Sequence, residues 1–184
     1  MERKSFGDMQ CPIARSLERV GEWWSILIMR DAFYGLTRFD EFQKSLGIAP
    51  NMLTRRLKGL VESGLMERRE YSSRPVRHEY VLTDAGREFR PVVLSLLVWG
   101  NKHFAPEGPS ILIKHAKTGK LAVPVLVDKT SGEEIAGSGA FKLVAGPAAD
   151  SELRKRLASQ YEACLLYTSP SPRDQRGSRM PSSA

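Results

Sequence analysis

Residues 39–82 decide the fold and read FDEFQKSLGIAPNMLTRRLKGLVESGLMERREYSSRPVRHEYVL. A short helix is predicted for residues 39–45, followed by a tight turn at residues 47–49. A second, longer helix is predicted from Pro50 to Ser63, because proline suits the first helical position, where its missing N–H has no intrahelical partner. Gly64 then supplies the left-handed residue that commonly ends a helix.

A charged hairpin is predicted directly after these two helices. Residues 65–71 form its outgoing strand and residues 77–82 its returning strand, with the tip at residues 72–76. Two helices joined by a tight turn and followed by such a hairpin are typical of a helix-turn-helix with a wing, a shape that fits duplex DNA.

The second helix has two distinct faces. Leu53, Leu57 and Leu60 fall on one face at helical spacing and must pack against the preceding helices. The opposite face carries polar side chains, with two more at its flanks: Asn51, Arg55, Lys58 and Glu62, flanked by Thr54 and Arg56. Asn and Arg bind purine edges in the major groove, and Lys binds phosphate. An ordinary solvated helix face is the alternative, but the arginine-rich hairpin favours DNA.

The distribution of charge supports an anionic partner. The 184 residues carry a net charge of +7. Between Pro50 and His78 there are seven basic and three acidic residues, a net charge of +4. Residues 1–104 as a whole contain 17 basic and 13 acidic residues, which is also a net charge of +4. The net excess of the first 104 residues therefore lies in the second helix and the hairpin, where it would neutralise phosphates.

These patterns assign a role to each candidate site residue. Three side chains are expected to read bases: Asn51, Thr54 and Arg55. Seven are expected to contact the DNA backbone or the minor groove: Arg56, Lys58, Arg68, Arg69, Arg74, Arg77 and His78. The alternative for the hairpin is an edge that carries charge only to avoid aggregation.

The flanking helices predict a dimer. One begins at Cys11 and Pro12 and ends at Gly21, and the helix at residues 22–33 is apolar on nearly every side, as expected at the centre of a core. A further helix runs from Thr83 to Phe104, where a proline at position 91 should kink or split it. The apolar surface of this helix is wider than the stripe that it needs to pack against the core of its own subunit. The expected dimer interface comprises Ile13, Leu17, Val93, Leu96, Leu97, Trp99 and Phe104. A two-fold dimer would place its recognition helices roughly 34 Å apart.

Several segments together resemble the HxlR-type bacterial regulators. They are Cys11-Pro12-Ile13, Arg38-Phe39-Asp40-Glu41-Phe42, Leu53-Thr54-Arg55-Arg56-Leu57-Lys58-Gly59-Leu60 and Tyr80-Val81-Leu82-Thr83-Asp84-Ala85-Gly86. The resemblance implies a homodimeric winged-helix protein that binds double-stranded DNA and controls transcription. In some relatives a cysteine near the N-terminus senses electrophiles or oxidants, and Cys11 matches that position. An inert thiol is the alternative, because the sequence shows no basic partner for Cys11.

The chain changes character after Phe104. Short strands are predicted at residues 111–113, 123–127 and 141–144. Two similar turns, residues 115–119 and 128–132, have the spacing of a zinc ribbon, but His115, Thr118, Asp128 and Ser131 stand where cysteines would be needed. We therefore expect metal-free turns in a β-rich appendage that assists dimerisation or binds an effector, and a short helix at residues 151–163.

The expected fold class is α+β, mainly α. Residues 1–10 are predicted to be a flexible arm, residues 11–105 a winged helix-turn-helix and dimerisation domain, residues 110–163 the extension, and residues 164–184 a disordered, non-native tail. No nucleophile–base set, phosphate loop or metal cluster points to an enzyme or a cofactor. No apolar run approaches the roughly 20 residues needed to cross a bilayer. Two cysteines give no disulfide framework and residues 1–10 are too polar for a signal peptide, so a cytoplasmic protein is expected. A protein–protein interaction module is the second function considered.

Overall fold

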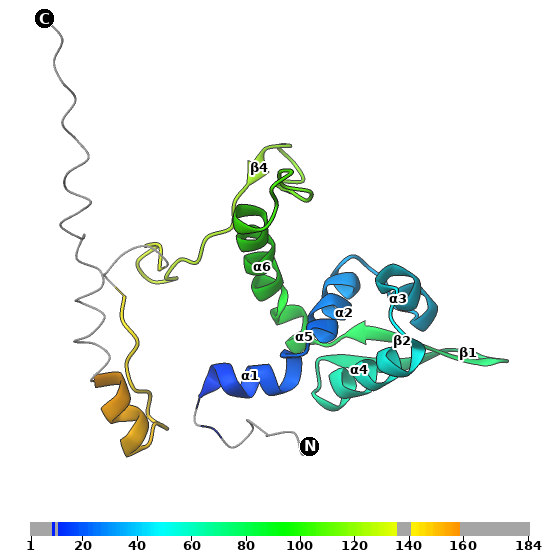
Figure 1. Ribbon diagram of the computed structural model, residues 1–184, viewed down its shortest axis with the longest axis horizontal. Helices are drawn as coiled ribbons and strands as arrows, with labels where there is room; N and C mark the ends of the chain where they lie inside the picture. The colour runs from blue at the N-terminus through cyan, green and yellow to red at the C-terminus, as the bar shows by residue number, and fades with distance from the viewer. Residues whose placement is uncertain (1–8, 10, 136–140, 159–184) are drawn as a thin grey trace, which may run out of the picture. The chain divides into compact units, whose positions relative to one another are not determined.

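The computed structural model of the protein describes residues 9, 11–135 and 141–158 (Figure 1). The predicted arm, apart from Met9, the predicted tail at 164–184 and the last part of the predicted helix at 151–163 lie outside these residues. The chain divides into two compact units, Met1–Val125 and Leu126–Ala184. The extension predicted for residues 110–163 is therefore divided between the two units.

The first two helices are α1, Pro12–Val20, and α2, Trp23–Phe33. Pro12 occupies the first turn of α1, where it costs no backbone hydrogen bond. Helix α2 is the central helix of the core, since Ile28 and Met29 are fully buried. This position agrees with a sequence that is apolar on nearly every side.

The helix-turn-helix consists of α3, Phe39–Leu46, and α4, Pro50–Glu62. Gly47 ends α3 with a φ of 60°, a left-handed conformation that glycine adopts without strain. Helix α4 begins at Pro50 and carries Leu53, Leu57 and Leu60 into the core, where each is at most 1% exposed. The structure therefore confirms the buried face predicted from leucine spacing.

The wing is a two-stranded antiparallel sheet of β1, Met66–Ser73, and β2, Val76–Leu82. Met66 pairs with Leu82 at its base, and Ser73 pairs with Val76 at its tip. The strand β1 packs beside α4, and the wing extends beyond α3 and α4 (Figure 1). Its base is buried in the core through Met66, so the hairpin starts from a fixed point.

Helix α5, Asp84–Glu88, packs closely against the connection between α4 and the wing. The Thr83 hydroxyl caps α5 by accepting from the N–H of Gly86 and donates to the carbonyl of Gly64. A Cβ at Gly86 would lie 2.0 Å from the Leu65 carbonyl oxygen. Only glycine fits this contact without displacing backbone.

The helix predicted from Thr83 to Phe104 is split, as was expected from its proline at position 91. Helix α6, Arg90–His103, is separate from α5, and Pro91 lies in its first turn. The two helices meet at Phe89, which packs against the core. Within the described ranges, no helix has both the length and the apolar character needed for a bilayer crossing.

The region after α6 contains less β-structure than its sequence predicts. The strands β3, Ile113–Lys114, and β4, Leu121–Ala122, pair with each other. Residues 123–127 form only one isolated bridge, from Val127 to Glu134, and residues 141–144 form no strand. Pro124 lacks the N–H that a continuous ladder requires. The predictions of strands at 123–127 and 141–144 are therefore wrong, and a helix covers residues 151–158.

The start of α3 leads to a pH-dependent prediction. The N–H groups of Arg38 and Thr37 donate to Glu41 Oε2 at 2.9 and 3.0 Å, and these bonds hold the pKa of the Glu41 carboxyl below its ordinary value of 4.5. Because the folded pKa is the lower one, the charged form stabilises the fold above pH 4.5, and this contribution is lost as pH falls through the folded pKa.

Replacing Glu41 by glutamine should therefore reduce stability most at neutral pH. Urea unfolding of wild type and of Glu41→Gln at a series of pH values from 7 to 3 should show the largest difference in free energy of unfolding near pH 7. The difference should narrow below pH 4.5. A difference that is constant across this range would contradict the role given to the carboxylate.

Candidate nucleic-acid interface

The exposed face of α4 presents the three side chains predicted to read bases. Asn51, Thr54 and Arg55 are all exposed; Asn51 and Arg55 lie on the side opposite the buried leucines, and Thr54 lies at the flank of that side. The Thr54 hydroxyl donates to the Pro50 carbonyl at 2.9 Å, which fixes the orientation of the side chain. The exposed groups of helix α4 therefore include an amide and a guanidinium, which can bind base edges.

Lys58 lies one turn further along the same face. Its side chain is 74% exposed and forms an ion pair with Glu62 at 3.6 Å. An exposed pair of this kind stabilises a helix only slightly. A phosphate group could therefore replace Glu62 as the partner of Lys58 at little cost.

Arg56 does not lie on the exposed face. Its side chain is 10% exposed, and its Nη2 donates to Glu22 Oε2 at 2.8 Å. The burial of Arg56 and its pair with Glu22 do not favour the predicted contact with the DNA backbone, which stays a prediction. Three residues turn a helix through about 300°, so Arg56 lies roughly 60° from Leu53 and on the border of the buried face.

The wing carries the remaining predicted backbone contacts. Arg68, Arg69, Arg74 and Arg77 are exposed, and His78 is half-buried. Two internal contacts organise these side chains: Arg68 Nη2 lies 3.0 Å from His78 Nδ1, and Arg69 Nε donates to Glu67 at 3.1 Å. The basic side chains therefore lie along both strands and at the tip of the wing.

The wing is joined to the start of α3 by contacts that the sequence did not reveal. The N–H of Tyr80 donates to the Thr37 carbonyl at 2.7 Å, and Arg38 forms an isolated bridge with Glu79. The Arg38 guanidinium also lies 4.8 Å from the centre of the Tyr71 ring, a cation–π contact. These contacts fix the wing relative to the helix-turn-helix. Arg38 is exposed beside the wing and is a further basic group on this surface.

The residues predicted for a dimer interface lie on two helices of the first unit. Ile13 and Leu17 on α1 are 71% and 49% exposed. On α6 and just after it, Leu96, Trp99 and Phe104 are exposed, whereas Val93 and Leu97 are half-buried. Trp99 and Phe104 stack edge-to-face with ring centres 4.8 Å apart. The structure therefore presents apolar side chains on the exposed faces of both helices.

Cys11 lies immediately before α1 as a free, half-buried thiol. The sulfur does not cap the helix, although the Cys11 carbonyl accepts from the N–H of Arg15 at 3.0 Å. This position agrees with the predicted helix start. Its sensing role stays a prediction.

The two turns that resemble a zinc ribbon are closed by hydrogen bonds of their own. His115 Nδ1 accepts from the N–H groups of Lys117 and Thr118, both at 3.2 Å. In the second turn, Asp128 Oδ2 accepts from the N–H of Ser131 at 2.7 Å, and this bond holds the pKa of Asp128 below its ordinary value. Among the described residues, no three His, Cys, Asp or Glu side chains gather as metal ligands would.

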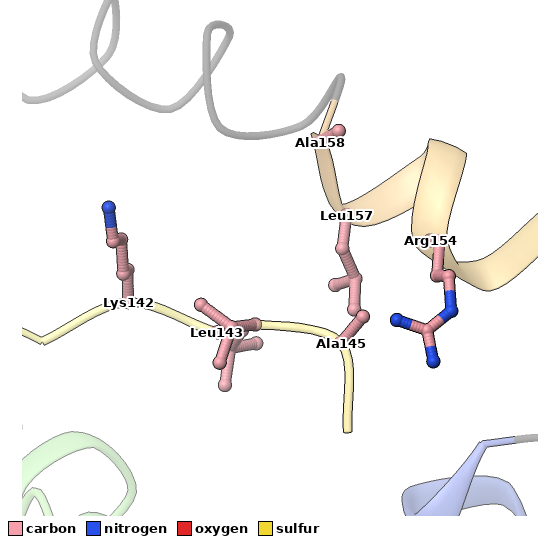
Figure 2. A pocket seen from close by; sticks show the side chains of 7 residues that line it. Lys142, Leu143, Ala145, Arg154, Leu157 and Ala158 are labelled. Carbon is pink, nitrogen blue, oxygen red and sulfur yellow. The ribbon is translucent and has the colours of Figure 1, made fainter. Parts of the chain in front are cut away.

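The second unit contains an open pocket of about 310 Å³ beside the helix at 151–158 (Figure 2). Leu143, Ala145 and Leu157 provide its apolar lining. Arg154 lies at its edge and donates to the carbonyls of Ala149, Gly146 and Pro147 at 3.0, 3.2 and 3.2 Å. Its guanidinium therefore holds the preceding turn together.

Helices α2–α4 and the wing β1–β2 define a winged helix-turn-helix protein. Comparison with known proteins narrows the class. The HxlR-like helix-turn-helix family matches residues 19–108. The HTH-type transcriptional regulator Rv3095 of Mycobacterium tuberculosis is 46% identical over 124 residues, covering 67% of this chain and 78% of the relative. YdeP of Bacillus subtilis, also named an HTH-type transcriptional regulator, is 35% identical over 94 residues, or 50% and 73% of the two chains.

Two solved structures are similar over most of the chain. PA1374 from Pseudomonas aeruginosa is 53% identical with a TM-score of 0.59, covering 80% of this chain and 100% of its own. PA1607 is 40% identical with a TM-score of 0.65, and the match covers 73% of this chain and 94% of PA1607. Both are named as candidate transcription factors. The chain belongs to the HxlR-like helix-turn-helix family, as the sequence motifs predicted, and is a transcriptional regulator with a helix-turn-helix DNA-binding domain.

Proposed function

We propose that this regulator acts as a homodimer on a two-fold symmetric operator, with α4 of each subunit in one of two successive major grooves. The observation that carries the proposal is the face of α4, where Asn51, Thr54 and Arg55 are exposed while the leucines behind them are buried. A helix anchored on one face and bearing amide and guanidinium groups on the other is suited to direct readout of bases. We assign the DNA-binding and dimerisation functions to residues 11–105.

The basic groups around α4 would contact the DNA backbone. This set consists of Lys58, Arg68, Arg69, Arg74, Arg77 and His78 and excludes the buried Arg56. Each phosphate that a basic group neutralises releases counterions, so affinity should fall with salt at a slope of about −0.9 per contact. The protein would act where the chromosome lies, in the cytoplasmic nucleoid.

The dimer is supported by the exposed apolar faces of α1 and α6. Large apolar side chains gathered on two helices of one unit are typical of a surface that a second subunit covers. A two-fold axis through this surface would relate the two copies of α4, so a palindromic site would match the symmetry of the protein. An electrophile or small molecule that reacts with Cys11 beside α1 could then change the dimer and its affinity for DNA.

Selection of bound duplexes from a random pool tests the proposal directly. Repeated selection with the full chain should enrich an inverted repeat whose half-sites are about one helical turn, 10–10.5 base pairs, apart. Gel shifts should then show at least roughly 1,000-fold tighter binding to the selected duplex than to random duplex. Equal affinity for both would contradict the proposal and favour a module that binds another protein.

Replacing Arg55 by alanine should weaken binding to the selected duplex by about 1–3 kcal/mol and relax the preference at one base pair, because one bidentate base contact is lost. Gel shifts with single-base variants of the duplex measure both effects. Arg90→Ala, which removes an exposed arginine from the start of α6, is the matched control and should retain wild-type preference. Unchanged affinity and preference in Arg55→Ala would remove Arg55 from the interface.

A further inference from the structure

We infer that Glu22 and Arg56 are positioning residues that set the orientation of the recognition helix α4 and thereby determine which bases it can read. This inference rests on the proposed function, because it concerns how the same surface is presented to DNA. Arg56 Nη2 donates to Glu22 Oε2 at 2.8 Å, across 34 residues of sequence. The bond joins α4 to the short connection between α1 and α2, where Glu22 directly follows Gly21 and precedes the first turn of α2.

The burial of Arg56 shows that its guanidinium acts inside the protein. The side chain is 10% exposed, compared with 74% for Lys58 two residues later on the same helix. Glu22 is 31% exposed, so the pair lies at the border of the core. A charge-assisted hydrogen bond in such a place depends strongly on the direction of its two partners. Removing the charge of Glu22 leaves the charge of Arg56 in a poorly hydrated site.

Apolar packing alone would leave the rotation of α4 poorly defined. Leu53, Leu57 and Leu60 hold the helix against the core, but apolar contact is non-directional, and a small rotation about the helix axis preserves most of it. The bond from Arg56 to Glu22 is directional, so a rotation that carries Arg56 away from Glu22 would weaken or break it. It therefore favours the observed orientation of α4.

The same orientation governs the residues that read bases. Arg55 precedes Arg56 directly, and Asn51 lies five residues before Arg56 on the same rigid helix. Any rotation or sliding of α4 that displaces Arg56 must displace these side chains as well. Base readout requires donors and acceptors to be placed accurately, whereas contacts to phosphate tolerate displacement. Loss of the pair should therefore reduce discrimination between sequences more than it reduces binding to DNA in general.

The experiment compares variants on the selected duplex and on random duplex at several salt concentrations. Arg56→Met removes the buried charge, and Glu22→Gln weakens the bond from the other side. The double variant removes both charges. Lys58→Met, the same substitution at an exposed position of α4, is the matched control. Thermal unfolding followed by circular dichroism measures the stability of each variant.

We expect Arg56→Met to bind the selected duplex roughly 10- to 100-fold more weakly, the range that follows from misplaced base contacts. Its affinity for random duplex and its salt slope should match wild type. Lys58→Met should instead lower affinity for both duplexes and reduce the slope by about 0.9. The double variant also lacks the bond and should not recover discrimination.

Three results would overturn the inference. Wild-type discrimination in Glu22→Gln and in the double variant would show that the pair does not position α4, and these variants decide the question even where Arg56→Met fails to fold. A reduced salt slope in Arg56→Met would make Arg56 a phosphate contact. A wild-type protein that does not discriminate between duplexes would overturn the proposed function and this inference together, whereas the first two results leave the proposed function intact.

Discussion

Replacing Leu57 by alanine should lower the free energy of unfolding by about 2–5 kcal/mol, because the substitution removes three carbons from a closed core and leaves a cavity. Leu57 is fully buried on α4, among Ile28, Met29 and Phe42. A domain of this size is stable by about 5–15 kcal/mol. The loss should therefore be a large fraction of the total.

Urea unfolding at fixed protein concentration, followed by far-ultraviolet circular dichroism, measures this loss. Leu143→Ala is the matched control, because the same atoms are removed from a side chain that is 82% exposed. The control should remain within about 0.5 kcal/mol of wild type. If Leu57→Ala were as stable as the control, α4 would not be held by its leucine face, and the proposed presentation of its polar face would lose its basis.

The positions of the helices could be predicted from the sequence because short-range signals marked their ends. Pro12 and Pro50 lie in first turns, and Gly64, just after α4, has the left-handed φ, 71°, that was expected of it. The spacing of Leu53, Leu57 and Leu60 predicted the buried face of α4, and all three are in the core. Local backbone chemistry and helical periodicity are sufficient for such features.

The pairing of Arg56 with Glu22 could not be predicted, for a different physical reason. The residue type of Arg56 suggested phosphate binding, but its place on α4 borders the leucine face, and its partner Glu22 lies 34 residues away. Helical periodicity shows that Arg56 is near the core and cannot show which acidic group neutralises it. The contact between Arg38 and Tyr71 was missed for the same reason, because it joins α3 to the wing. Pairings between distant segments depend on the assembled fold.

The strand predictions for the region after α6 were wrong for a third reason. Residues 123–127 and 141–144 have the apolar, β-branched composition of strands, but a strand forms only when a neighbour completes its hydrogen bonds. In the described residues, the ladder from β3 to β4 ends at Ala122, two residues before Pro124. Composition alone therefore overestimated the β-structure of this region.

Replacing Leu96 by aspartate should convert the proposed dimer to a monomer and weaken binding to the selected duplex by roughly 100- to 10,000-fold. Leu96 is 41% exposed on α6, one turn before Trp99, so the new charge should be hydrated in the monomer and the fold should survive. In a dimer the carboxylate would be buried against apolar side chains without a partner, at a cost of several kcal/mol. Separate subunits would then lose the gain in affinity that comes from binding two half-sites with one linked dimer.

Light scattering during gel filtration should report a mass near the 20.6 kDa of one chain for Leu96→Asp and twice that for wild type. Because one subunit makes half the phosphate contacts, the salt slope on the selected duplex should also fall to about half. Leu143→Asp places the same charge on an exposed leucine of the second unit and should remain dimeric. A dimeric Leu96→Asp would show that another surface joins the subunits, whereas a monomeric wild type that still selects an inverted repeat would mean that the two subunits assemble only on DNA.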